Sequence, residues 1–316
     1  MGNSKSVYAI DVRGLTKSFQ KNTAVDHVDI CVEKGNICGF LGPNGSGKTT
    51  TMRMLCGLLT PDAGEGTCLG ENILHQGAAI KRKIGYMTQH FSFWEDMTIE
   101  ENLKFTTDLY GLSNPRDRVN KALEELGLTQ RAKQLAGQLS GGWKQRLALA
   151  ACTIHEPELL LLDEPTAGVD PQARREFWDE IYHLADEGIT VLVSTHYMDE
   201  VERCHDIIYM YRGKIATSGT VEEVIEGAGL TSWMVRGKAV MDLREKLDKI
   251  SAIRSVAPFG DSLHISGTDP KALEDALAPF KDKDEFEWVK VTPSFEDIFI
   301  RYMNADNIQV GEQKDV

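Results

Sequence analysis

A glycine-rich loop near the N-terminus constrains this chain more than any other segment. The loop runs from Gly42 to Thr49 and fits the pattern G-x-x-x-x-G-K-[ST], which wraps nucleotide phosphates. Glycines let the backbone adopt positive φ and turn its N–H groups inward, so that an anion site forms at the start of a helix. The apolar run 36–41 predicts a buried strand before the loop, and residues 50–55 predict the start of a helix after it. The sequence therefore predicts a loop that binds a nucleoside triphosphate.

Each residue type in the loop has an expected task. We expect Lys48 to reach the β- and γ-phosphates and the hydroxyl of Thr49 to ligate Mg²⁺. The residues that we expect to contact the nucleotide here are Gly42, Pro43, Asn44, Gly45, Ser46, Gly47, Lys48, Thr49 and Thr50.

Composition excludes several other classes of protein. A length of 316 residues suggests roughly two domains. A net charge of −13 argues against a nucleic-acid surface, because no broad basic field is available. The six cysteines form no C-x-x-C pair and are expected to be reduced. No apolar run approaches the roughly 18 residues that span a bilayer, and we expect no signal peptide.

Apolar strands alternate with helices through the middle of the chain. The runs 159–162 and 190–194 predict buried strands, with a helix over 172–178 between them. This alternation is typical of an α/β fold whose parallel sheet is covered on both faces. Short β-like runs precede the loop strand, and helical periodicity dominates from 99 to 136.

Four polar residues follow predicted strands and complete a catalytic set. Asp163 and Glu164 end an apolar strand, where an acidic Mg²⁺ ligand is commonly followed by a general base. We expect Asp163 to hold the metal with Thr49 and Glu164 to polarise the attacking water. Gln89 supplies an amide for Mg²⁺ and water, and His196 an imidazole for the γ-phosphate.

A second, smaller domain follows a change in composition near residues 227–229. The predicted order beyond it is β-α-β-β-α-β, which is the ferredoxin-like pattern of a small α+β domain. Gly260 and Asp261 form a good hairpin turn between the two middle strands. A last helix is expected to start at Pro293–Ser294, and residues 305–316 form a polar tail.

The run Leu139-Ser140-Gly141-Gly142 is the motif that identifies a family resemblance. Together with Gln89, Asp163 and His196, it makes residues 7–225 resemble the ATP-binding-cassette (ABC) ATPases. The resemblance implies a RecA-like P-loop core, an N-terminal antiparallel β-subdomain and an α-helical subdomain. The implied cofactors are ATP and Mg²⁺, and the implied catalytic residues are Glu164, His196 and Gln89. The resemblance also implies that Phe19 stacks on adenine. Further implied nucleotide contacts are Ser140, Gly141, Gly142 and Asp163.

The resemblance also implies that two cassettes work as a pair. In the family, the Ser140 segment closes over ATP that is bound to the opposite protomer, and residues 167–170 match the loop that passes between protomers. Two ATP molecules then join two cassettes, and hydrolysis releases them. Trp143 departs from the family, which usually has Gln at this position. Two arrangements fit the sequence: a pair of two copies, or a pair of this chain with a second ATP-binding subunit.

The ending of the chain points to exporters. Residues 292–300, Thr-Pro-Ser-Phe-Glu-Asp-Ile-Phe-Ile, resemble the ending of the drug-resistance subfamily of export ATPases. The resemblance implies an ABC domain over 1–227 (helical subdomain about 90–155) and an integral-membrane permease as a separate chain. It places the protein peripherally on the cytoplasmic face of the inner membrane. The composition change and the β-α-β-β-α-β order predict the accessory domain over 228–304.

Two alternatives accompany this interpretation. The first is a soluble ABC ATPase that acts on nucleic acid or ribosomes, but such proteins carry coiled-coil insertions or tandem cassettes, and this chain has neither. The second concerns Phe91, Phe93 and Trp94 after Gln89. These aromatics either contact the permease or pack within the helical subdomain.

Overall fold

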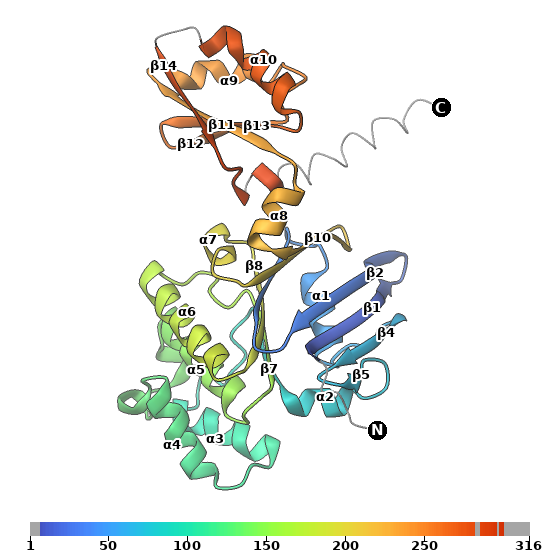
Figure 1. Ribbon diagram of the computed structural model, residues 1–316. Helices are drawn as coiled ribbons and strands as arrows, with labels where there is room; N and C mark the ends of the chain where they lie inside the picture. The colour runs from blue at the N-terminus through green and yellow to red at the C-terminus, as the bar shows by residue number, and fades with distance from the viewer. Residues whose placement is uncertain (1–6, 282–284, 296, 300–316) are drawn as a thin grey trace. The chain divides into compact units, whose positions relative to one another are not determined.

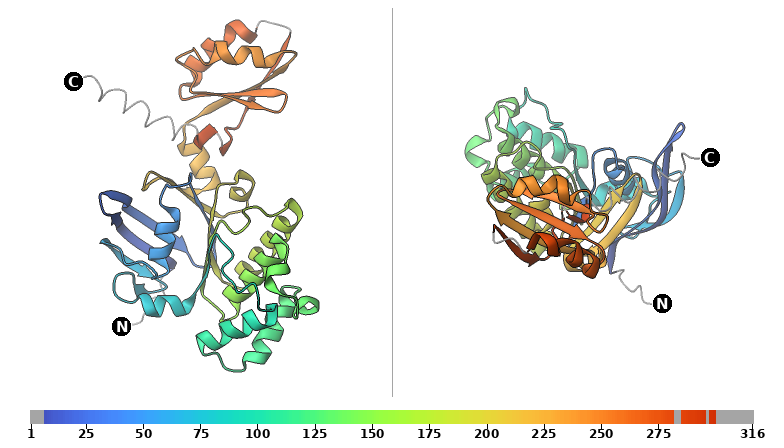
Figure 2. Two further views of the ribbon diagram at one scale, coloured as in Figure 1. Left: turned by 180° about the vertical axis from the view of Figure 1, so that it is seen from behind. Right: turned by 90° about the horizontal axis from the view of Figure 1, so that it is seen from above.

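The computed structural model describes residues 7–281, 285–295 and 297–299. They form two compact units that divide between Ser218 and Gly219. Each unit has its own buried apolar cluster, one within residues 9–210 and the other within residues 235–277. Figures 1 and 2 show the chain from three sides.

An antiparallel sheet opens the first unit. Its strand order is β2-β1-β4-β5. The predicted short β runs lie within two long paired strands, and Phe19 is the last residue of β1. The turn that follows falls on Gln20 and Lys21, where Gln20 adopts a φ of 55°. The strands are β1 (Tyr8–Phe19), β2 (Asn22–Glu33), β4 (Ala63–Cys68) and β5 (Glu71–Asn72).

A six-stranded sheet forms the centre of the first unit, in the order β10-β9-β3-β8-β7-β6. The neighbours from β9 to β6 pair in parallel, as the alternation of strands and helices predicts. Every residue of β3, β7 and β8 is buried, so their continuous apolar runs are explained by helices or sheet on both faces. The strands are β3 (Ile37–Leu41), β6 (Ile84–Met87), β7 (Leu159–Asp163), β8 (Thr190–Thr195), β9 (Asp206–Tyr211) and β10 (Lys214–Thr220).

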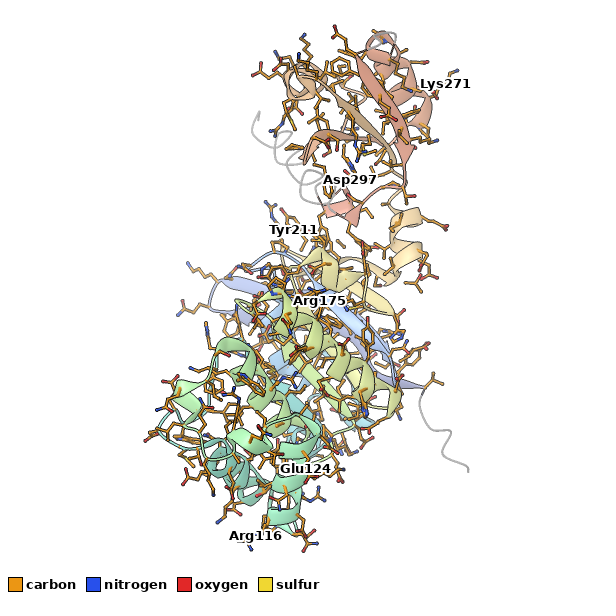
Figure 3. The ribbon with its side chains drawn as sticks, turned by 90° about the vertical axis from the view of Figure 1, so that its left-hand side faces the viewer. Arg116, Glu124, Arg175, Tyr211, Lys271 and Asp297 are labelled. Atoms are coloured by element: carbon orange, nitrogen blue, oxygen red, sulfur yellow. The ribbon has the colours of Figure 1, made fainter. Side chains whose placement is uncertain are left out.

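Helices cover this sheet, and α1 lies between it and the antiparallel sheet (Figure 1). On α4 the apolar face that includes Val119 and Leu123 is buried, whereas Arg116 and Glu124 project outward (Figure 3). Within the described residues no helix is long and apolar enough to cross a membrane. The helices are α1 (Lys48–Leu55), α2 (Gly77–Lys83), α3 (Ile99–Tyr110), α4 (Pro115–Glu125), α5 (Gly141–Thr153), α6 (Pro171–Asp186) and α7 (Met198–Val201).

The predicted helical stretch 99–136 is broken rather than continuous. A capping box between Thr98 and Glu101 starts α3, and Gly111 ends it with a φ of 63°. Pro115 then starts α4, because proline fits the first turn of a helix. Between α4 and α5 the chain forms only short 3₁₀ turns at 129–131 and 136–138.

The second unit has the predicted β-α-β-β-α-β pattern. Its sheet order is β12-β13-β11-β14, with every pair antiparallel, and Gly260 turns the hairpin with a φ of 61°. The first helix of this pattern is short, because a 3₁₀ turn at Val240–Leu243 precedes the four residues of α9. The elements are α8 (Val221–Gly227), β11 (Thr231–Gly237), α9 (Arg244–Leu247), β12 (Ser255–Phe259), β13 (Ser262–Gly267), α10 (Pro270–Lys281) and β14 (Phe286–Val291).

A final helical turn begins where the sequence predicts it. The amide of Asp297 donates to the hydroxyl oxygen of Ser294 at 3.2 Å, and the amide of Ser294 donates to a carboxylate oxygen of Asp297 at 2.9 Å. This reciprocal pair caps the turn (Figure 3 labels Asp297). The predicted polar tail 305–316 lies outside the described residues.

Candidate active site

The glycine-rich loop joins β3 to α1 in a conformation that requires glycine. Gly42 and Gly47 have φ angles of 149° and 111°. A Cβ atom would lie 2.1 Å from the Met210 carbonyl oxygen at Gly42 and 2.5 Å from the Ala24 carbonyl oxygen at Gly47. Any side chain at either position would therefore push the loop away from its neighbours.

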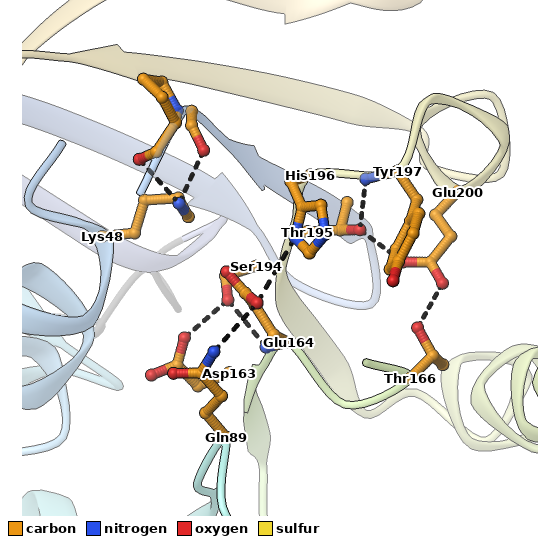
Figure 4. Close-up of polar contacts among 12 residues, drawn as sticks. Lys48, Gln89, Asp163, Glu164, Thr166, Ser194, Thr195, His196, Tyr197 and Glu200 are labelled. Atoms are coloured by element: carbon orange, nitrogen blue, oxygen red, sulfur yellow. Dashed lines mark hydrogen bonds and ion pairs between the residues drawn. The ribbon is translucent and has the colours of Figure 1, made fainter. Parts of the chain in front are cut away.

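Lys48 is held against the loop by the loop's own carbonyl groups. Its ammonium donates to Gly42 O at 2.7 Å and to Pro43 O at 3.2 Å (Figure 4). Burial lowers the pKa of Lys48, and the carboxylates of Glu164 and Asp163 act in the opposite direction. The side chain is thus a cation fixed at the N-terminus of α1.

A pocket of about 300 Å³ opens beside this lysine. Gln89 and Glu164 line it opposite the loop, although they follow two other strands. An ammonium, a hydroxyl and a helix N-terminus form a donor set that suits phosphate oxygens, and the nearby carboxylates suit a hard cation. The lining residues are Ala24, Asn44, Gly45, Gly47, Lys48, Thr49, Thr50, Gln89 and Glu164.

The three predicted catalytic side chains meet at one carboxylate oxygen. Gln89 Nε2 donates to Glu164 Oε2 at 3.1 Å, and His196 Nδ1 lies 3.4 Å from the same oxygen (Figure 4). They follow the neighbouring strands β6, β7 and β8, whose parallel pairing brings their carboxyl ends to one edge of the sheet. Glu164 is therefore oriented from both sides.

Ser194, the penultimate residue of β8, joins the two acids and was not singled out in the sequence. Its hydroxyl donates to Asp163 Oδ1 at 2.7 Å and accepts from the Glu164 amide at 2.9 Å. Glu164 itself has a φ of 48°, a strained conformation for a residue with a side chain. The polar end Ser194–Thr195 of an otherwise apolar strand is the signal that could have identified this contact.

The remaining predicted nucleotide contacts do not line the pocket. Phe19 is 48% exposed at the end of β1, with Lys17 Nζ 5.9 Å from its ring centroid. Ser140 is the N-cap residue of α5, but its hydroxyl makes no capping hydrogen bond. Gly142 packs so closely on α6 that a Cβ would lie 2.7 Å from Ala173 Cβ.

Trp143 follows Gly142 and lies close to two guanidinium groups. Arg131 lies 4.5 Å and Arg146 5.4 Å from the Trp143 ring. Arg146 also bonds Glu176 on α6 at 2.9 Å. The side chain that replaces the family's usual Gln therefore connects the start of α5 to a charged network.

We expect Trp143→Ala to lower the free energy of unfolding by about 1–2 kcal/mol, because two cation–π contacts of about 0.5–1 kcal/mol each are lost. Leu109→Ala is the control, since Leu109 is 71% exposed, and should stay within about 0.5 kcal/mol of wild type. Urea unfolding measures both. Equal urea midpoints for the two variants would contradict the proposed contribution of Trp143 to the free energy of unfolding.

Comparison with known proteins assigns the fold to a family. The ABC transporter family model matches residues 25–167. A probable multidrug ABC transporter ATP-binding protein, YbhF of Escherichia coli (strain K12), is 44% identical over 217 residues, which is 68% of this chain and 38% of that protein. The chain thus spans well under half of this relative. The Nod factor export ATP-binding protein I of Burkholderia thailandensis is 34% identical over 94% of this chain and 97% of its own length.

A solved structure agrees with the sequence relatives. A dimeric ATP-binding cassette in a post-hydrolysis state, bound to ADP and phosphate, aligns with a TM-score of 0.62 at 25% identity, covering 67% of this chain and 98% of that one. The first unit is therefore an ABC-type nucleotide-binding fold, with a P-loop core, an antiparallel β-subdomain and a helical layer. The chain belongs to the ABC transporter ATP-binding protein family.

Proposed function

We propose that this chain binds and hydrolyses ATP to drive an ABC exporter through a separate membrane permease. The observation that carries the proposal is the single pocket in which Lys48 and Thr49 face Gln89 and Glu164. A phosphate-binding loop opposite an oriented carboxylate is the arrangement that phosphoryl transfer to water needs.

In this proposal the loop and Lys48 bind the β- and γ-phosphates of ATP. Thr49, Gln89 and Asp163 would hold Mg²⁺, which neutralises charge on the phosphates when it is bound. Asp163 is ready for that role, because the Ser194 hydroxyl fixes its Oδ1 at 2.7 Å. The buried ammonium of Lys48 is fixed by two carbonyl oxygens and needs little rearrangement to meet an anion.

Glu164 acts as the general base in the proposed reaction. It takes a proton from the water that attacks the γ-phosphorus, and the contacts from Gln89 and His196 hold its carboxylate in place. His196 is 41% exposed at its side chain, so the ring is accessible to the γ-phosphate. The strained backbone of Glu164 is consistent with a position selected for chemistry.

Hydrolysis is proposed to need two cassettes. Ser140, whose hydroxyl does not cap its own helix, and the first N–H groups of α5 would meet the γ-phosphate held by the other cassette. Residues 167–170 would pass between them, and Phe19 would stack on adenine. The dimeric relative with ADP and phosphate supports this arrangement.

The partners and location follow from the export relatives. Both a multidrug transporter protein and a Nod factor export protein are related to this chain, which favours export over action on nucleic acid or ribosomes. The proposed permease contact is the segment after Gln89, where Trp94 packs on Phe105 at 4.4 Å and still remains 46% exposed. The protein would then lie peripherally on the cytoplasmic face of the membrane.

Purification of the tagged chain from native membranes tests this proposal. We expect an integral-membrane protein to co-purify and ATP hydrolysis to be present in the eluate. Salt-sensitive recovery of ribosomes or nucleic acid, with no membrane protein, would instead support the soluble alternative.

We propose residues 1–227 as the ATP-binding domain, with its helical subdomain at about 90–155, and 228–304 as an accessory domain that tunes pairing or turnover. Truncation after Glu226 should leave the Kd for ATP within about threefold of wild type, because the pocket is built from residues 24–164. Calorimetric titration, hydrolysis rate and mass of the truncated chain provide the test. Loss of ATP affinity in a folded truncation would contradict the proposed division.

A further inference from the structure

Glu200, on the short helix α7, is a buried acid that the proposed mechanism does not use. It is 0% exposed, although carboxylates are rarely found in the interior without partners. The nearby Asp199 is 66% exposed at its side chain. A carboxyl group at this position therefore needs specific hydrogen-bond partners.

Its partners come from three different segments. Thr166 Oγ1 donates to Glu200 Oε1, and Thr195 Oγ1 donates to Glu200 Oε2 at 2.5 Å (Figure 4). Arg174 Nε, on α6, lies 3.6 Å from Glu200 Oε1. Each carboxylate oxygen thus accepts a hydrogen bond from a hydroxyl, and the partly buried guanidinium of Arg174 lies beside the carboxylate.

Two of these segments carry catalytic groups. Thr166 stands two residues after Glu164, and Thr195 directly precedes His196. Glu200 connects the chain just beyond the base to the chain just before the histidine. The distance of 3.4 Å between His196 Nδ1 and Glu164 Oε2 depends on the same two segments.

A second set of contacts reaches His196 from the same cluster. The Tyr197 amide donates to Thr195 Oγ1 at 3.1 Å, and the Tyr197 ring lies 4.2 Å from the His196 ring. The Arg174 guanidinium lies 4.1 Å from the centroid of the Tyr197 ring. The ion pair of Glu200 therefore supports the imidazole through Tyr197 as well as through Thr195.

We propose that Glu200 is a positioning residue for ATP hydrolysis, which sets the placement of Glu164 relative to His196 by bonding Thr166 and Thr195. The inference rests on the proposed ATPase function. Glu200 does not reach the pocket, so its loss should slow turnover without weakening the binding of ATP. Misplacing catalytic groups by about 1 Å can cost roughly 100-fold in rate.

The test compares Glu200→Gln and Thr195→Val with wild type in the full chain. Glu200→Gln keeps the shape and removes the charge, and Thr195→Val removes one hydroxyl without touching the acid. We expect kcat to fall by about 10- to 100-fold in each, while KM for ATP stays within about threefold. Glu202→Gln is the matched control, because Glu202 is exposed two residues further on and should hydrolyse ATP at the wild-type rate.

The double variant, which combines Glu200→Gln with Thr195→Val, distinguishes a positioning role from a general loss of folding stability. If Glu200 and Thr195 act as a unit, the double variant should be no slower than Glu200→Gln alone. A wild-type kcat in both Thr195→Val and folded Glu200→Gln would overturn the inference. So would a loss of kcat/KM that comes only from a higher KM. A different result would overturn the proposed function, and this inference with it: a wild-type chain whose ATP hydrolysis is absent, or is not abolished by Glu164→Gln.

Discussion

Glu164→Gln should lower ATP hydrolysis by roughly 10²–10⁴-fold, the contribution expected of a general base. The substitution keeps the size of the side chain and can keep the contact with Gln89, which is 3.1 Å long in the wild type. It removes the carboxylate that would take the proton from water. ATP should therefore still bind, because Lys48 and the loop are unchanged.

Phosphate release and ATP titration on the same preparation separate the two effects. Glu158→Gln is the matched control, since Glu158 is exposed at the opposite end of the same strand and should leave the rate unchanged. An unaltered rate in Glu164→Gln would remove Glu164 from its proposed role. Equal losses in both variants would point to a general disturbance of β7.

Lys48→Ala should weaken both the binding and the hydrolysis of ATP. Hydrogen bonds to charged groups contribute about 1.5–3 kcal/mol, which corresponds to roughly a 10- to 100-fold rise in Kd. The buried ammonium donates to two carbonyl oxygens of the loop, and its removal leaves the backbone donors to hold the phosphates alone. We expect the fold to persist, because the glycine positions of the loop are set by contacts with Met210 and Ala24.

Calorimetric titration with ATP measures the affinity, and a melting curve without nucleotide measures the fold. Lys34→Ala is the control, since Lys34 is exposed just before β3 and should bind ATP as wild type does. Wild-type affinity in Lys48→Ala would contradict the assignment of the loop to phosphate.

The sequence predicts the parts of the site that depend on local spacing. Positions Gly42 and Gly47 and the run of buried residues before them determine a strand, a loop and a helix without reference to the rest of the chain. Asp163, Glu164 and His196 could be placed because each follows an apolar strand, and parallel strands end at one edge. The β-α-β-β-α-β order of the second unit was predicted from periodicity in the same way.

Contacts between distant segments were not predictable from one sequence. Ser194 and Glu200 looked like an ordinary strand residue and an ordinary helix acid, and only the fold shows that each joins two parts of the site. Trp143 was recognised as a departure, but Arg131 lies twelve positions before it, so their stacking follows from the packing of the helical layer. The break in the helical stretch 99–136 was missed because its periodicity outweighed the signals of Gly111 and Pro115.

The most direct test of paired, ATP-driven action is the mass of Glu164→Gln in solution, measured by light scattering after size exclusion. With ATP and Mg²⁺ the account predicts twice the mass of a single chain if the pair is built from two copies, and the single-chain mass with ADP. Ser140→Arg should prevent the doubling while ATP still binds, because the bulky side chain would block the start of α5. One mass under both nucleotides, with ATP shown to be bound, would contradict pairing of two copies around ATP.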